Sequence, residues 1–285
     1  MSDDHLYLSL AEASSEGDAR WAFGTGFEDP LHGIDTALPP GVDPGELAAR
    51  CLALGDDALV SAQRLAEWVT RAPELEEEVA LANIGLDLLG QARLLLARAG
   101  QAEGQGRGED ELAYFRGPQE FRNVRLVELP NGDFAECVAR LLLFSTWRLA
   151  AFQVLTAHPD PVLAAIAAKG VNELAYHRDH AAQWTLRLGD GTELSRQRMQ
   201  QGVAQVWPYL DELLAETPEL SAEVLRTLRQ VLAAATLSVP ESVTATTAAV
   251  ATAAGSGRTG EHTPHLAALL AELQSVARAD PEATW

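Results

Sequence analysis

Residues 67–93 read EWVTRAPELEEEVALANIGLDLLGQAR, and this stretch restricts the fold more than any other part of the chain. It contains a turn and a helix start, because Pro73 suits a first helical turn and the glutamates after it complement the positive end of the helix dipole. Beyond the glutamates the sequence is almost entirely apolar, except for one carboxylate, Asp87. A long apolar helix with a lone acid at its middle predicts the buried core of a helical bundle.

The composition favours an all-helical protein and limits its partners. Ala and Leu dominate the apolar residues, which favours helices over strands, and 285 residues can bury a sizeable core. The 41 acidic residues outnumber the 21 basic ones, which gives a net charge of −20. Such a surface repels nucleic acid and anionic membranes, disfavours a polyanionic ligand such as CoA, and suits a partner with a basic face.

Two further features concern the location of the protein in the cell. Cys51 and Cys137 lie in predicted helices without metal-type spacing, so we expect buried thiols rather than disulfides or metal ligands. The first residues lack the basic flank and apolar run of a signal peptide, and no uninterrupted apolar stretch has the length of a membrane span. We therefore expect a soluble cytoplasmic protein that binds neither membrane nor nucleic acid.

Helical periodicity divides the chain into an extension and one helical domain. Residues 1–44 contain scattered acids, glycines and prolines without sustained periodicity, and we expect them to be irregular. Apolar spacing predicts a helical domain over residues 45–285, with a helix stop at Gly100 and a kink at Pro208. The expected helices cover residues 45–71, 73–99, 110–116, 133–158, 160–188, 193–215, 218–237 and 263–277.

Short turns make the first two long helices antiparallel neighbours, and likewise the third and fourth. Counting outward from the first turn places Asp87 level with residues 57–61 of the first helix. The candidates that face it are therefore Asp56, Asp57 and Ser61.

The fourth helix carries its own polar pair. Glu173 and His177 interrupt an otherwise apolar stripe on this helix. The level that faces them on the third helix, residues 140–145, has no carboxylate, and Glu136 lies about one turn away. The third helix is therefore expected to contribute least to a site.

These polar residues resemble an incomplete di-iron site. Ferritin-like di-iron proteins place a Glu on two helices and a Glu-x-x-His on the other two. Here Gly90 occupies the position after Asp87 where a histidine is needed, and His177 follows Glu173 by four residues rather than three. We expect no catalytic residue and no bound metal. The degenerate site is instead expected to be a hydrogen-bonded or ionic network of Asp87, Gln91, Glu173, His177 and Asp57.

The alternative is a di-metal enzyme that uses the same residues. It needs further carboxylates, and Glu136 or Glu67 are the candidates if the counting of levels is wrong by a turn. Metal content and activity of the chain alone distinguish the two hypotheses.

Several motifs resemble one family, the C subunits of bacterial phenylacetyl-CoA epoxidases in phenylacetic acid degradation. The resemblance extends from about residue 52 to residue 285. The motifs that carry it are QRLAEW at 63–68, APELE at 72–76, LANIGLDLLGQAR at 81–93, ELPNGDFAE at 128–136, ELAYH at 173–177 and RLGDGT at 187–192.

This resemblance implies a part in a multicomponent oxygenase. A sister A subunit would hold the di-iron centre and the CoA substrate, and a reductase with flavin and iron–sulfur groups would supply electrons from NADPH. The C subunit would have a ferritin-like fold without iron ligands and would bind the A subunit as a structural partner. A hetero-oligomer is expected, with a homodimer for the chain alone, and the expected interface residues are Phe121, Val124, Leu126 and Trp147. A ferritin-like binding protein of an unrelated pathway remains a third hypothesis.

Overall fold

The computed structural model describes residue 31 and residues 33–240 and 256–283. Most of the extension over residues 1–44 that was expected to be irregular lies outside the described residues. In the described part of the chain every regular element is a helix, which confirms the all-α prediction.

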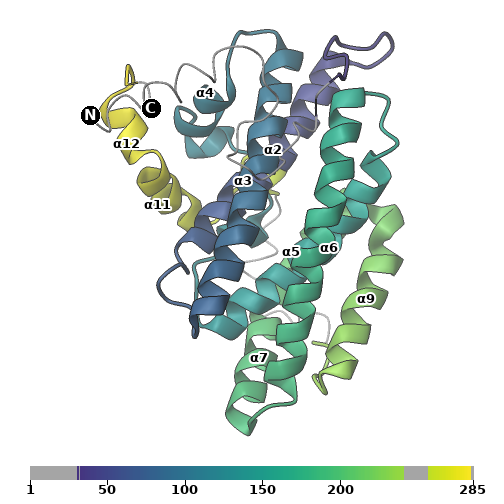
Figure 1. Ribbon diagram of the computed structural model, residues 1–285, viewed down its shortest axis with the longest axis vertical. Helices are drawn as coiled ribbons and strands as arrows, with labels where there is room; N and C mark the ends of the chain where they lie inside the picture. The colour runs from purple at the N-terminus through teal and green to yellow at the C-terminus, as the bar shows by residue number, and fades with distance from the viewer. Residues whose placement is uncertain (1–30, 32, 241–255, 284–285) are drawn as a thin grey trace, which may run out of the picture.

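Four long helices form two hairpins. Helices α2 (Pro44–Ala66) and α3 (Leu75–Glu103) pack along each other, and so do α5 (Phe134–Leu155) and α6 (Pro161–Gly189). The two hairpins meet where α3 contacts α6 (Figure 1). The bundle therefore has the antiparallel pairs that the short turns predict.

Aspartates fix where three of these helices begin. Asp43, Asp133 and Asp160 are the N-cap residues of α2, α5 and α6. Each carboxylate accepts a hydrogen bond from the backbone N–H three residues later, at 2.8, 3.0 and 2.8 Å. Each bond satisfies an N–H that has no partner within the helix. The starts at Asp133 and Asp160 could therefore be predicted from a few residues, whereas the first helix was expected to begin at residue 45.

The prediction that Gly100 stops the second helix is wrong. Helix α3 continues through Gly100 to Glu103, and Gly104 at φ +67° forms the left-handed cap. A Cβ at position 100 would lie 2.0 Å from the carbonyl oxygen of Arg107, so the glycine permits a close approach of the returning loop. The first helix also ends earlier than expected, at Ala66.

Shorter helices complete the domain. The helix expected to kink at Pro208 breaks there instead, because proline removes a helical hydrogen bond, and a 3₁₀ turn separates α7 from α8. In Figure 1, α9 and α11 lie on opposite sides of the long helices. The remaining elements are α4 (Glu109–Tyr114), η1 (Pro118–Glu120), η2 (Arg125–Glu128), α7 (Glu193–Val206), η3 (Trp207–Tyr209), α8 (Leu210–Glu216), η4 (Pro218–Leu220), α9 (Ser221–Ala234), η5 (Gly257–Thr259), α11 (Pro264–Leu273) and α12 (Ser275–Ala279).

Two helices, α3 and α5, have the length and hydropathy of a membrane span, a property that core helices of soluble proteins share. Of the most apolar 18-residue window, 89% is buried in α5 but only 39% in α3. Helix α5 is thus the central core helix, whereas much of the apolar surface of α3 lies uncovered.

Candidate functional site

The first polar pair joins α3 to α6. The Nε2 atom of His177 lies 3.0 Å from the Oδ2 atom of Asp87. His177 is completely buried, and the side chain of Asp87 is 38% exposed at the seam between the two helices. The other ring nitrogen of His177, Nδ1, has no hydrogen-bond partner among the described residues. Asp87 and His177, which the sequence predicts to lie together, are therefore in contact through one carboxylate and one imidazole.

A second pair lies along the same seam. Gln91 donates a hydrogen bond from Nε2 to Glu173 Oε2 at 2.9 Å. The other oxygen of Glu173 pairs with Lys169 Nζ at 3.0 Å. Both oxygens of this carboxylate are thus bound by groups of the protein.

The third long helix, α5, adds a positive charge that contacts the Gln91–Glu173 pair. Arg148 of α5 is completely buried, and its guanidinium donates to Gln91 Oε1 and to the carbonyl oxygen of Leu54, each at 3.1 Å. Its centre lies 4.4 Å from the ring centroid of Phe152, a favourable cation–π distance. Burial lowers the pKa of Arg148 to about 10, although Asp57 opposes this effect, so the side chain stays protonated at neutral pH. The core therefore has a permanent positive charge of its own.

Asp57 of α2 forms the far end of the network. It is completely buried, and its Oδ2 atom lies 3.9 Å from Arg148 Nη1. Arg258, near the end of the chain, binds both Asp57 oxygens at 2.9 and 2.8 Å, and the N–H of Val124 donates to Oδ1 at 2.8 Å. Burial alone would lower the pKa of Arg258, but the carboxylates of Asp57 and Glu216 raise it above its ordinary value.

These residues do not fit a di-iron centre. Such a centre needs carboxylates from all four helices and two histidines. Here α5 contributes the guanidinium of Arg148, and Glu173 and Asp57 are bound by side chains of basic residues. Among the described residues, no group of three or more His, Cys, Asp or Glu side chains converges in a way that could hold a metal ion.

The other candidate carboxylates lie away from this network. Asp56 pairs with Arg116 and accepts from the N–H of Arg122 at 2.8 Å. Glu67 binds Arg64 and Asn131, each through one oxygen. Neither acid is available to complete a metal site with Asp87.

Glu136 is also unsuited to a metal site. Its side chain hydrogen-bonds to Gln205, and burial with the nearby charge of Asp133 raises its pKa. It lies in the first turn of α5, and no hydrogen bond or ion pair joins it to Asp87 or His177 within the part of the chain that the structure describes. The geometry therefore gives no support to Glu136 as the missing metal ligand.

A third pair between α3 and α6 was missed from sequence. His180 Nε2 lies 3.3 Å from Glu77 Oε2, and both side chains are only 11% exposed. Burial lowers the pKa of His180, an effect that the charge of Glu77 opposes. Its charged neighbours Arg178 and Asp179 are typical of a solvated side of a helix, but the facing helix α3 covers His180.

The four residues expected at a partner interface are buried in the chain itself. Phe121, Val124 and Leu126 are each 0% exposed and Trp147 is 1% exposed. This corrects the expectation that they form an exposed contact region. The apolar excursion of residues 121–128 packs inward as part of the core.

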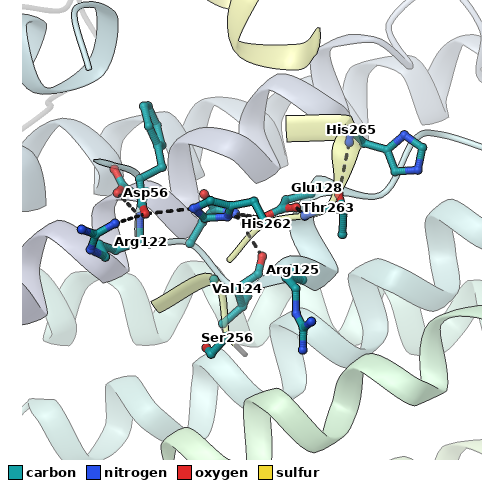
Figure 2. Close-up of polar contacts among 12 residues, drawn as sticks. Asp56, Arg122, Val124, Arg125, Glu128, Ser256, His262, Thr263 and His265 are labelled. Atoms are coloured by element: carbon teal, nitrogen blue, oxygen red, sulfur yellow. Dashed lines mark hydrogen bonds and ion pairs between the residues drawn. The ribbon is translucent and has the colours of Figure 1, made fainter. Parts of the chain in front are cut away.

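Polar contacts with the C-terminal part of the chain fix this excursion in place. The buried carboxylate of Glu128 contacts His262 Nδ1 at 2.6 Å and accepts from the N–H of Thr263 at 2.7 Å, and Asn123 donates to it at 2.9 Å. Figure 2 shows Glu128, His262 and Thr263 close together. The side chain of Arg258 also donates to the carbonyl oxygen of residue 122 at 2.5 Å. The excursion thus links the bundle to the C-terminal segment.

Both cysteines are buried, as expected. Cys51 is 0% and Cys137 is 2% exposed, and neither forms a disulfide. Burial raises the pKa of Cys51 to about 12 and that of Cys137 to about 11. The thiols are protonated at neutral pH and unreactive.

Arg148 and Arg258 are two further site residues that were not predicted from the sequence. A signal existed for Arg148, because it is a lone charge in the apolar stretch LLLFSTWRLAAF of residues 141–152, just as Asp87 is in its own helix. No comparable signal existed for Arg258, which lies 201 residues from Asp57 in sequence.

Comparison with known proteins agrees with the resemblance of the motifs. Residues 37–285 match the family described as phenylacetic acid catabolic protein. The chain is also 43% identical over 255 residues to the C subunit of 1,2-phenylacetyl-CoA epoxidase from Escherichia coli K12, covering 84% of this chain and 99% of that protein. The chain therefore belongs to the phenylacetic acid catabolic protein family.

Proposed function

We propose that the chain is a non-catalytic C subunit of a phenylacetyl-CoA epoxidase, which binds and stabilises the di-iron A subunit in aerobic phenylacetate degradation. The observation that carries this proposal is the buried guanidinium of Arg148, held by Gln91 and the carbonyl oxygen of Leu54 between the long helices. A fixed cation 3.9 Å from Asp57 repels a metal ion. Gln91 and Lys169 bind the carboxylate of Glu173, and Arg258 binds that of Asp57. The identity to the E. coli protein supports the choice of complex.

In this proposal the chain holds no cofactor of its own. Iron belongs to the A subunit, and NADPH, flavin and iron–sulfur groups belong to the reductase. The complex is a cytoplasmic hetero-oligomer, and the net charge of −20 supports a partner with a basic face.

Omission of single subunits tests the proposal. Epoxidation of phenylacetyl-CoA is measured with the A subunit, the reductase, NADPH and O₂, with and without this chain. Activity that rises when the chain is added, together with no activity for the chain and reductase without the A subunit, is the expected result. Activity without the A subunit would instead make the chain a di-iron oxygenase in its own right. The proposal would also be contradicted if the activity and stability of the A subunit did not change when the chain is added.

A further inference from the structure

Helix α3 has two apolar faces rather than one. Leu81, Ile84, Leu88 and Leu95 form the inner face and are completely or almost completely buried in the bundle. A second row of apolar residues lies on the opposite side of the helix, with spacings of four, three, four and three residues, and its last member, Leu89, is partly buried against the core. This outer face consists of Leu75, Val79, Ala82, Leu86 and Leu89.

The outer face is largely uncovered. Leu75, Val79 and Leu86 are 71%, 53% and 63% exposed. Single exposed leucines are common on protein surfaces, but a contiguous apolar row is typical of an interaction site. The row explains why only 39% of the most apolar window of α3 is buried.

A groove runs beside the outer face, between α2 and α3. It has a volume of about 330 Å³, and Leu86 and Leu89 form one wall. Ala62 and Ala66 of α2 lie across from them, and Gly85 forms part of the lining. Tyr114 of α4 and Leu273 of α11 also line it. The groove is therefore mostly apolar, and small residues of α2 and α3 form the part of it where a second helix could approach closely.

The spacing indicates what kind of element fits. Apolar residues that alternate at three and four positions form the seam along which two helices pack in a coiled coil. An amphipathic helix in an apolar groove is a recurring mode of protein recognition. The outer face thus matches a helix of another chain better than a loop or a small ligand.

The charges around the outer face indicate which protein supplies this helix. The acidic side chains of Glu76 and Glu78 flank the row at its N-terminal end. A second copy of this chain would bring another net charge of −20 to the contact, which opposes self-association. A partner with basic residues beside its apolar row would be attracted.

We infer that the outer face of α3 docks an amphipathic helix of the catalytic A subunit, one that carries basic residues beside its apolar row. This inference rests on the proposed function, since it assigns a surface to the partner named there. The docking helix covers Leu86 and inserts along the groove between α2 and α3.

The test is a single substitution on the full-length chain, with a matched control. Leu86→Asp places a charge at the centre of the outer face and, because Leu86 is 63% exposed, leaves the core intact. Its Kd for the purified A subunit should rise about 30-fold or more, as for loss of a central interface residue. The control is Leu194→Asp on α7, where the leucine is 57% exposed and lies off this face. Its Kd should stay within about 3-fold of the wild-type value.

Hydrogen exchange identifies the occupant of the face. Amides of residues 75–93 should become more protected when the A subunit is added to the wild-type chain. If these amides are equally protected without the A subunit, a segment of the chain itself covers the outer face, and the inference is wrong. A wild-type homodimer that Leu86→Asp dissociates without weakening binding to the A subunit would assign the face to a second copy.

Failure of the inference and failure of the proposed function give different results. If wild type and Leu86→Asp bind the A subunit equally well, the docking face is wrong while the scaffold role stands. If the wild-type chain does not bind the A subunit at all, the proposed function itself fails.

Discussion

At the scale of single residues, Arg148 explains how this bundle keeps acids in its core. A buried carboxylate needs a compensating charge, and Asp57 has the guanidinium groups of Arg148 and Arg258. The amide of Gln91 links Arg148 to Glu173, so the network extends across four helices through side chains alone. The positive charge at the centre of this network thus belongs to a buried side chain of the chain itself.

Removal of this cation should therefore destabilise the fold. Arg148→Met is expected to lower the free energy of unfolding by about 3 kcal/mol, because it leaves Gln91 and the Leu54 carbonyl without partners and Asp57 with less compensation. Urea unfolding followed by circular dichroism measures the change, and Arg148→Lys, which keeps the charge, should lose less. A Met variant as stable as the wild type would show that the network does not depend on the guanidinium.

His180 gives the stability of the chain a dependence on pH. Burial lowers its pKa below the ordinary 6.5, although Glu77 and Asp179 oppose the effect, while His177 and Arg187 add to it. The unfolded chain thus takes up this proton at higher pH than the folded chain. The free energy of unfolding should fall as the pH drops from 6.5 through the folded pKa.

The matched variant is His180→Gln, which cannot take up the proton. Between pH 7 and about 5.5 it should lose less stability than the wild type, measured by urea unfolding at each pH. The same loss in both proteins would mean that other groups cause the pH dependence.

At the scale of elements, helix starts could be read from the sequence and some helix ends could not. The starts at Asp133 and Asp160 depend on a hydrogen bond to a residue three positions away, so local sequence suffices. The end of α3 depends on tertiary structure, because Gly100 accommodates the Arg107 carbonyl and does not terminate the helix. A glycine in a helical pattern is equally consistent with a helix end and with a close contact inside the helix.

Two glycines of α3 provide a matched comparison of these roles. Gly90→Ala meets no atom within 4 Å, so it should stabilise the protein by about 0.5–1 kcal/mol through helix propensity. Gly100→Ala meets a backbone oxygen at 2.0 Å and should destabilise it by about 1–3 kcal/mol. Thermal and urea unfolding of the two variants measure the difference. A stabilised Gly100→Ala would contradict the close approach of the loop.

At the scale of the whole molecule, counting residues from the turns predicted the partners within each hairpin, and the di-iron pattern related the two hairpins. The counting placed Asp87 of α3 level with residues 57–61 of α2, because antiparallel hairpins with short turns have a nearly fixed register. The pattern grouped Asp87 with His177 of α6, and these two side chains lie 3.0 Å apart. The counting could not find Arg258, since no hairpin relates the end of the chain to α2. Nor could it tell that Phe121, Val124, Leu126 and Trp147 are buried in the chain itself, because whether an apolar residue lies inside or outside depends on the packing of all helices.

In the proposed function the chain is a ferritin-like scaffold whose core charge comes from arginine rather than iron. Elemental analysis of the purified full-length chain, expressed alone with iron supplied, distinguishes this scaffold from a di-iron enzyme. A scaffold should contain far less than one iron per chain in a well-folded helical protein. About two irons per chain, the content of a complete site in this class of bundle, would contradict it and make Asp87, Glu173 and His177 candidate ligands.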